Sequence, residues 1–150
     1  MTNNAMSYGI DILAVQEHRF YHPDISIKYQ QEHCYQLITS SASKTSGNST
    51  VGGVGFLLSA KASSNLVSVE SISPRILLIE LEGNPRTTII CVYSPHNACN
   101  IEDIEEFYSS LKQTVEQVPL HNFLVIAGDL NAKLGPPDVQ FSFDAKTNHN

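Results

Sequence analysis

The chain has 150 residues, of which 41% are hydrophobic, so it can bury a core, and a single domain is expected. No apolar run approaches the ~20 residues of a membrane span, and the N-terminus lacks the basic start and apolar stretch of a signal peptide, which predicts an intracellular protein with no membrane partner. The formal net charge of −6 argues against nucleic-acid binding driven mainly by long-range attraction, although a local basic face could still meet phosphates.

The first half of the chain predicts strands separated by loops. Residues 10–16 read as a strand buried on both faces, and residues 34–39 as another. Residues 40–50 are rich in Ser, Thr, Gly and Asn, which is typical of a connection. The glycines of residues 52–55 lack the spacing of a dinucleotide fingerprint, so we interpret them as turn and close-packing residues before a strand at 56–59.

The second half predicts strands at residues 66–72, 75–81 and 87–93, the last two forming a hairpin. A further apolar run, residues 123–127, reads as a buried strand. Between them the spacing of apolar residues predicts an amphipathic helix from the cap Asn100 to the stop at Pro119. Its predicted buried stripe is Ile101, Ile104, Tyr108, Leu111, Val115 and Val118. Many strands with few helices indicate an α+β fold.

Three cysteines, Cys34, Cys91 and Cys99, contain no Cys-x-x-Cys pair and cannot all pair with one another, which disfavours a disulfide framework or a zinc knuckle. Cys91 lies within an apolar run and is predicted to be a small core side chain. His96 and Cys99 are three residues apart, but two such residues without a second pair are more typical of surface than of a zinc site.

Polar residues follow three of the apolar runs. Glu17 ends the first, Tyr93 the run at 87–93, and Asp129 and Asn131 the last. Open α/β architectures place ligands where strands end, so we expect one shared site. A carboxylate suits a divalent cation, a phenol can donate to a phosphate oxygen, and alternation in extended backbone would point Asp129 and Asn131 the same way.

Each of these residues also has a structural interpretation. Glu17 could pair with Arg19 at the surface, and Tyr93 could be an amphipathic residue at the core edge. Asp129 and Asn131 could form an Asx-type turn, and Asn97, in the loop after Tyr93, could contact substrate or serve as turn chemistry.

Three motifs, Asp11-Ile12-Leu13-Ala14-Val15-Gln16-Glu17, Val92-Tyr93-Ser94-Pro95 and Gly128-Asp129-Leu130-Asn131-Ala132, resemble successive motifs of the endonuclease/exonuclease/phosphatase superfamily. The stretches between them most resemble the endonuclease domain of non-LTR retrotransposons. The resemblance implies a four-layer α/β/β/α sandwich of the deoxyribonuclease I-like type and a DNA-nicking phosphodiesterase that uses Mg²⁺ or Mn²⁺.

The resemblance also implies a role for each site residue. Glu17 would be the metal ligand, and Asp129 would position or activate the attacking water. Asn131 would bind phosphate and fix the Asp129 carboxylate, Tyr93 would hydrogen-bond the phosphate, and Asn97 would contact substrate.

The chain departs from the family pattern at both ends. Members carry an asparagine on a strand well before the metal-binding glutamate and an Asp-His pair near the C-terminus, and this sequence matches neither. We therefore expect residues 1–150 to be a partial domain, truncated at both ends, with little or no nuclease activity alone. The resemblance implies DNA as substrate, a reverse transcriptase region of the same polyprotein as partner, and a nuclear location. A phosphatase of the same superfamily, or a non-catalytic relic or interaction module, are the alternatives.

Overall fold

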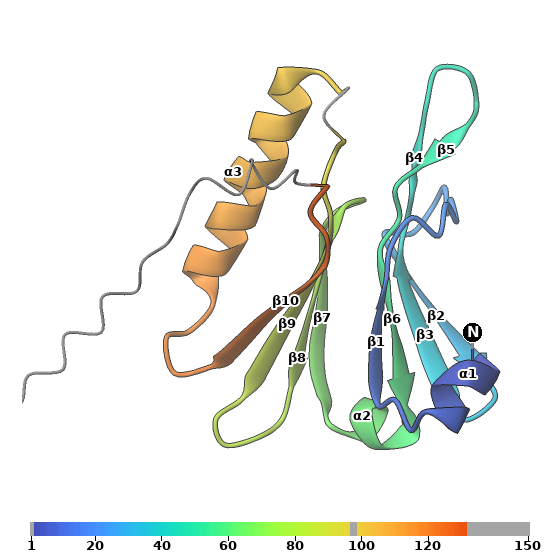
Figure 1. The fold of residues 1–150 in the computed structure, drawn as a ribbon, viewed down its shortest axis with the longest axis vertical. Coiled ribbons are helices and arrows are strands. Elements are labelled where there is room, and N and C mark those ends of the chain that lie inside the picture. Colours follow the sequence, from blue (N-terminus) through green and yellow to red (C-terminus); the bar gives the residue numbers. More distant parts are fainter. Residues whose placement is uncertain (1, 97–98, 132–150) are drawn as a thin grey trace, which may run out of the picture.

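Two four-stranded sheets pack face to face in the computed structural model, which describes residues 2–96 and 99–131 (Figure 1). The first sheet is antiparallel throughout the described chain. Its strands, in order across the sheet, are β1 (Ile12–Val15), β6 (Gly55–Ser59), β3 (Tyr35–Ser40) and β2 (Ile27–Glu32). A two-stranded ribbon of β4 (Ser43–Lys44) and β5 (Thr50–Val51) extends beyond it.

The second sheet combines antiparallel and parallel pairing. Its strands, in order, are β10 (Phe123–Asp129), β9 (Thr87–Tyr93), β8 (Ile76–Leu81) and β7 (Leu66–Ser73). β7, β8 and β9 form an antiparallel meander. Helix α3 (Ile101–Gln117) then returns the chain to the end of the sheet at which β9 begins, so β10 runs parallel to β9. The short helix α2 (Ala60–Ser64), capped by the Ser59 hydroxyl, joins the two sheets.

Among the described residues, three clusters of buried side chains hold these layers together. Alternation along the strands sends Phe56, Leu77 and Cys91 into the core between the sheets, and Ile90 and Val92 into the cluster beneath α3. A third cluster lies where helix α1 (Thr2–Ser7) packs on the outer face of the first sheet. The protein is therefore an α+β sandwich with helices on both outer faces. Within the described residues no helix is long and apolar enough to cross a membrane.

Most predicted elements are confirmed, including the β8–β9 hairpin and the buried position of Cys91. The predicted stripe of α3 was wrong in part, because Phe107 and Thr114 are buried while Ile101 is 71% and Tyr108 44% exposed. The predicted burial of the strands at 10–16 and 123–127 was also wrong. Among the described strands, β1 and β10 lie at the edges of their sheets, and Phe123 is 60% exposed.

Candidate functional site

Tyr93 and Asp129 occupy paired positions at the ends of the parallel strands β9 and β10. Side chains alternate along each strand, and Cys91 and Val125 contact the core between the two sheets. Two residues beyond Cys91, Tyr93 lies on this same inner face, and Asp129 follows Val125 by four residues. Both side chains therefore lie on the face of the second sheet that is turned toward the first sheet. We call the end of the sandwich at which β9 and β10 terminate its mouth.

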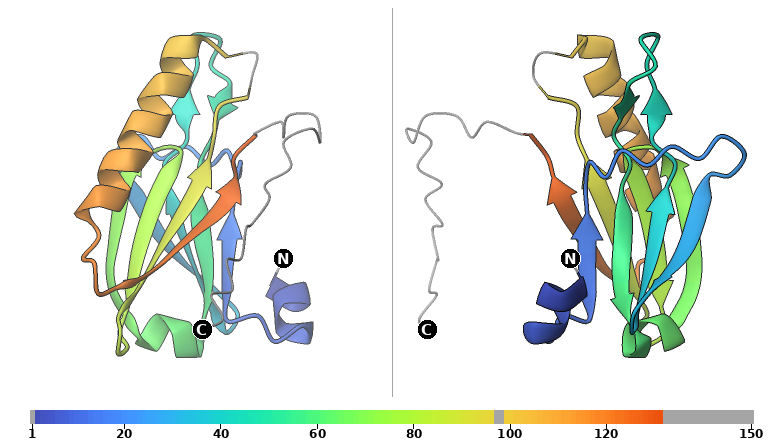
Figure 2. Two further views of the ribbon diagram at one scale, coloured as in Figure 1. Left: turned by 60° about the vertical axis from the view of Figure 1, so that its left-hand side comes forward. Right: turned by 90° about the vertical axis from the view of Figure 1, so that its right-hand side faces the viewer.

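Strand β1 brings Glu17 to this mouth from the other sheet. The Cys91 thiol donates to the Val15 carbonyl, and the Gln16 amide donates to the Cys91 sulfur, each at 3.5 Å. These contacts hold the end of β1 against β9. The ends of β1 and β10 lie side by side in both views of Figure 2. Glu17 follows Gln16 directly and has a φ of 53°, so the chain turns sharply there.

The side chains of Glu17 and Tyr93 shift each other's pKa. A hydrogen bond from Arg19 is the largest influence lowering the pKa of Glu17, and hydrogen bonding by Tyr93 adds to it. Burial raises the pKa of Tyr93, and the negative charges of Glu17 and Asp129 raise it further. The Glu17 side chain is 40% exposed, so the carboxylate is ionised and accessible to solvent.

Asp129 and Asn131 form an Asx-type turn at the end of β10. The Asn131 backbone N–H donates to Asp129 Oδ1 at 2.8 Å, and the Asn131 amide donates to the Ser94 carbonyl at 2.7 Å. Asn131 has a φ of 47°, so the strand alternation expected to align its side chain with Asp129 does not extend to it. The turn fixes one oxygen of the Asp129 carboxylate, and Asp129 remains exposed.

A string of backbone hydrogen bonds ties the Glu17 turn to Tyr93. Arg19 N–H donates to the Gly52 carbonyl at 3.1 Å, and Gly53 N–H donates to the Pro74 carbonyl at 2.9 Å. The next residue, Arg75, accepts from the Tyr93 N–H at 2.9 Å. The separation between Glu17 and Tyr93 is thus set by the backbone of three loops rather than by side-chain packing alone.

His18 has a structural role in this turn. Its Nδ1 accepts from the Phe20 N–H at 2.9 Å, so the ring carries its proton on Nε2, which lies 3.2 Å from the Val54 carbonyl. A Cβ on Gly53 would come within 2.5 Å of the His18 ring, which explains the glycine. Burial lowers the pKa of His18, consistent with a neutral packed ring.

Arg75 is a residue of this site that the sequence did not assign to it. Its guanidinium lies 5.3 Å from the centre of the Tyr93 ring and donates to the Tyr93 carbonyl at 3.2 Å. Its charge lowers the pKa of both Glu17 and Tyr93. The predicted hairpin could have identified Arg75, because counting back from its turn places Arg75 opposite Tyr93.

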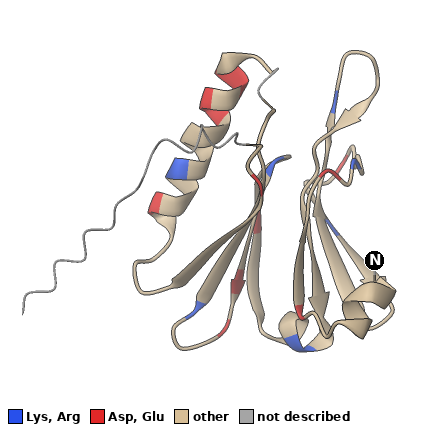
Figure 3. Ribbon diagram, viewed as in Figure 1, with Lys and Arg blue, Asp and Glu red and all other residues tan. Residues whose placement is uncertain are grey.

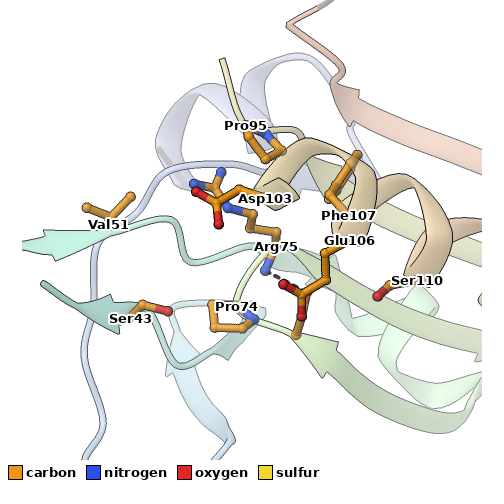
Figure 4. Close-up of a pocket in the computed structure, with 10 residues that line it drawn as sticks. Ser43, Val51, Pro74, Arg75, Pro95, Asp103, Glu106, Phe107 and Ser110 are labelled. Atoms are coloured by element: carbon orange, nitrogen blue, oxygen red, sulfur yellow. Dashed lines mark hydrogen bonds between the residues drawn. The ribbon is translucent and has the colours of Figure 1, made fainter. Parts of the chain in front are cut away.

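Arg75 also lines a separate cavity of about 380 Å³ between the β4–β5 ribbon and α3 (Figure 4). Figure 4 shows Arg75 among Asp103 and Glu106 of the helix, with Val51 of the ribbon on the other side. The sequence-predicted residues Glu17, Tyr93, Asp129 and Asn131 are not among the lining residues of this cavity. We call these four residues, which lie at strand ends of the two sheets, the candidate site.

Asn97 lies outside the described residues, so its contact with substrate stays a prediction. In the part of the chain that the structure describes, no three His, Cys, Asp or Glu side chains gather as a metal-binding group.

Comparison with known proteins yields two distant relatives. Craniofacial development protein 2 of Bos taurus is 26% identical over 88 residues, and the protein of the same name from Tragulus javanicus is 25% identical over 88 residues. Each match covers 58% of this chain and 15% of the relative, so this chain corresponds to a small part of those proteins. No family model matches the chain. No solved structure matches it.

Proposed function

We propose that the chain carries the phosphate-handling site of a divalent-metal-dependent phosphodiesterase with a deoxyribonuclease I-like fold, most similar to the DNA-nicking endonuclease of a non-LTR retrotransposon. The observation that carries this proposal is the meeting of Glu17, Tyr93 and Asp129 at one edge, although they come from two sheets. In the whole protein we expect DNA as substrate, a reverse transcriptase region in the same polyprotein and a nuclear location.

The side chains of the candidate site fit Mg²⁺ or Mn²⁺. Mg²⁺ usually keeps several waters and takes one or two protein carboxylates plus substrate phosphate, so a three-residue cluster is not required. Glu17 would hold the ion, because it is ionised and accessible, and the cation would replace the Arg19 guanidinium as its partner. When bound, the metal would polarise the scissile phosphate and stabilise its developing charge.

The remaining side chains divide the other tasks. The second oxygen of Asp129 would accept a proton from the attacking water, since its first is held by the Asn131 N–H. Tyr93 would donate its hydroxyl to a phosphate oxygen, and the Asn131 amide has a second N–H for the same anion. Arg75 would keep the Tyr93 ring in place.

The distribution of charge favours an anionic substrate at this mouth despite the acidic total. Residues 65–131 account for the whole net charge of −6, whereas residues 1–64 carry equal numbers of acidic and basic residues. Many of these acids lie along α3, on the outer face of the second sheet (Figure 3). A phosphate approaching from the side of the first sheet therefore meets little of the acidic excess.

Manganese binding to the 150-residue chain tests the proposal, measured by water-proton relaxation. We expect Mn²⁺ to bind, and Glu17→Gln to weaken binding by roughly tenfold or more, as expected for loss of a direct ligand. Glu116→Gln is the matched control, because this exposed acid lies on α3, paired with Lys112 at 3.9 Å. Equal Mn²⁺ affinity in the wild type and in Glu17→Gln would rule the proposal out.

Nicking of supercoiled plasmid DNA with Mg²⁺ then tests the chemistry. We expect little nicking by residues 1–150 alone. Nicking that disappears in Asp129→Ala would support the phosphodiesterase and show that the expected inactivity of this chain was wrong. Cleavage of inositol phosphates instead of DNA would favour the phosphatase alternative.

A non-catalytic interaction module is the second candidate, and one observation favours it. Two carboxylates of the candidate site already have partners, since Glu17 contacts Arg19 and one oxygen of Asp129 accepts from the Asn131 N–H. A chain that binds no Mn²⁺ and gains no nuclease activity when longer flanking sequence is present would favour this candidate.

A further inference from the structure

We propose that a groove beside Glu17 binds a single strand of nucleic acid through its phosphates and its unpaired bases. The proposal goes beyond the proposed function, because it concerns a binding surface next to the candidate site and a strand that is not paired. The groove has a volume of about 440 Å³. We call it the β2 groove, and it is lined by Arg19, Phe20, Tyr21, His22, Lys28, Gln30 and Thr39.

The lining of the β2 groove combines basic and aromatic side chains. Lys28 contributes positive charge, as does Arg19, whose charge is partly offset by the Glu17 carboxylate, and no carboxylate is among the described lining residues. Phe20 is 53% and Tyr21 37% exposed, so both rings present apolar surface to solvent. Lys44 of the ribbon lies 4.6 Å from the centre of the Tyr21 ring and adds a further cation at the rim. Cations with exposed rings are the combination that binds phosphates and stacked bases together.

Hydrogen bonds hold the loop that carries these rings in a fixed position. The Ala42 N–H donates to the Phe20 carbonyl at 2.9 Å, and the His22 N–H donates to the Ser41 hydroxyl at 2.9 Å. The Ser41 hydroxyl donates in turn to the His22 carbonyl at 3.0 Å. Because the backbone on either side of Tyr21 is anchored to residues 41 and 42, the rings are displayed by a preformed loop, which lowers the ordering cost of binding.

The β2 groove adjoins a second cavity that reaches Glu17. Phe20 and Thr39 also line a neighbouring cavity of about 450 Å³, whose other lining residues include Glu17. Arg19, at the end of the groove, contacts the Glu17 carboxylate. A strand whose phosphate lies at Glu17 could therefore continue past Phe20 toward Tyr21 and Lys28.

The aromatic rings favour a single strand over a duplex. In duplex DNA the faces of the bases are stacked on one another, so exposed rings gain little from them. Unpaired bases present a free face, and each base stacked on an aromatic side chain contributes enough for alanine substitution to weaken binding roughly fivefold or more. DNA and RNA strands share this chemistry, so the experiment compares them.

Fluorescence anisotropy with labelled oligonucleotides of about 12 nucleotides, in EDTA, tests the proposal without metal-dependent chemistry. We expect single strands to bind at least roughly fivefold more tightly than a duplex of the same sequence, from the contribution of one stacked base. Tyr21→Ala should lose this preference and Tyr21→Phe should keep it, because phenylalanine retains the ring. Lys28→Ala should weaken binding to any sequence and reduce the slope of log affinity against log salt by roughly 1.

Two variants on the same half of the molecule are the controls. Tyr8→Ala removes an aromatic residue that is 79% exposed, and Lys61→Ala removes a lysine whose side chain is 81% exposed, both away from the β2 groove. Neither should change binding. Equal affinity for single strands and duplex, no binding, or equal losses in the control variants would overturn the proposal. The RNA and DNA strands then identify which sugar the groove prefers.

The metal-binding test separates this proposal from the proposed function. If the phosphodiesterase proposal fails while the groove is real, Glu17→Gln will bind Mn²⁺ as the wild type does and Tyr21→Ala will still lose single-strand binding. If the groove proposal fails alone, Tyr21→Ala will bind oligonucleotides normally and Glu17→Gln will lose Mn²⁺.

Discussion

Tyr93 and Asp129 end two adjacent parallel strands at the same level, and the Ser94 N–H donates to the Asp129 carbonyl at 2.8 Å. Parallel pairing is what makes their side chains neighbours, because parallel strands end at the same edge of a sheet. The connection through α3 produces this pairing. The helix thus contributes to the candidate site without placing a side chain in it.

Replacing Arg75 should change the titration of Tyr93 in a defined direction. The Arg75 charge stabilises the phenolate, so Arg75→Met should raise the pKa of Tyr93, and Arg75→Lys should raise it less. Glu17→Gln should lower it, because the Glu17 charge opposes the phenolate. NMR titration of the tyrosine ring carbons, with Tyr93→Phe for assignment, measures both shifts. Arg86→Met is the control, since Arg86 pairs with Glu82, and a lower pKa in Arg75→Met would contradict the assignment.

Gly128→Ala should destroy the pairing of β9 and β10. Its φ is 148°, and an added Cβ would lie 1.9 Å from the Val92 carbonyl oxygen, which belongs to rigid strand backbone. We expect a loss of about 4 kcal/mol or more in the free energy of unfolding. Gly47→Ala should change it by less than about 0.5 kcal/mol, because the nearest atom to its added Cβ is Thr45 Oγ1 at 3.9 Å. Urea denaturation of the two variants gives the comparison, and similar losses would mean that the close approach at Gly128 is wrong.

Acidification should destabilise the protein through His18 before it affects Glu17. Burial lowers the pKa of His18 in the folded state, so the unfolded chain takes up the proton more readily. The contribution of neutral His18 to stability is fully present above the pKa of about 6.5 that histidine has in the unfolded chain. It is lost as the pH falls from there toward the lower pKa of His18 in the folded state. Glu17, whose folded pKa is also lowered, loses its contribution only below its unfolded pKa of about 4.3.

Measuring the free energy of unfolding at pH 7.5 and at pH 5.5 separates the effect of His18 from that of Glu17. We expect the wild type to lose stability between these values and His18→Asn to lose less of it. Because burial also lowers the pKa of His22, His22→Asn serves as the comparison, and an unchanged pH dependence in His18→Asn would exclude this role.

The buried face of α3 can be tested with two adjacent aromatic residues. Phe107 is 5% exposed and Tyr108 44% exposed. Phe107→Ala should cost about 3–5 kcal/mol by opening a cavity beneath the helix, whereas Tyr108→Ala should cost about 1 kcal/mol or less. Equilibrium denaturation distinguishes them. A larger loss of stability in Tyr108→Ala than in Phe107→Ala would support the buried face that the apolar spacing predicted.

Strands with many apolar residues were predictable from the sequence. Strands that are polar or only two residues long were not. The runs ending at Tyr93 and Asp129 have enough apolar residues to specify strands. β2 was missed because five of its six residues, all but Ile27, are polar or amphipathic, and it lies at the sheet edge. β4 and β5 have two residues each, too few for a periodic signal.

The apolar runs also predicted that polar residues at the strand ends would share one site. The directions of the Glu17 and Asn131 side chains could not be predicted in this way. Glu17 and Asn131 both have positive φ values, which break the two-residue alternation on which the sequence argument depended. Side-chain direction at these positions follows the turn. The pairing of Arg75 with Tyr93 differs from these contacts, because the register of the predicted hairpin already places the two residues opposite each other.

The Cys91 thiol, contacting both Val15 and Gln16, makes the distance between the sheets a determinant of the candidate site. A bulkier residue in the shared core could separate the sheets slightly while leaving each one intact. Such a variant would keep its secondary structure and much of its stability but move Glu17 away from Tyr93. Loss-of-function screens should therefore recover interior positions such as Ile38 and Leu77, which are not part of the candidate site, among the sensitive sites.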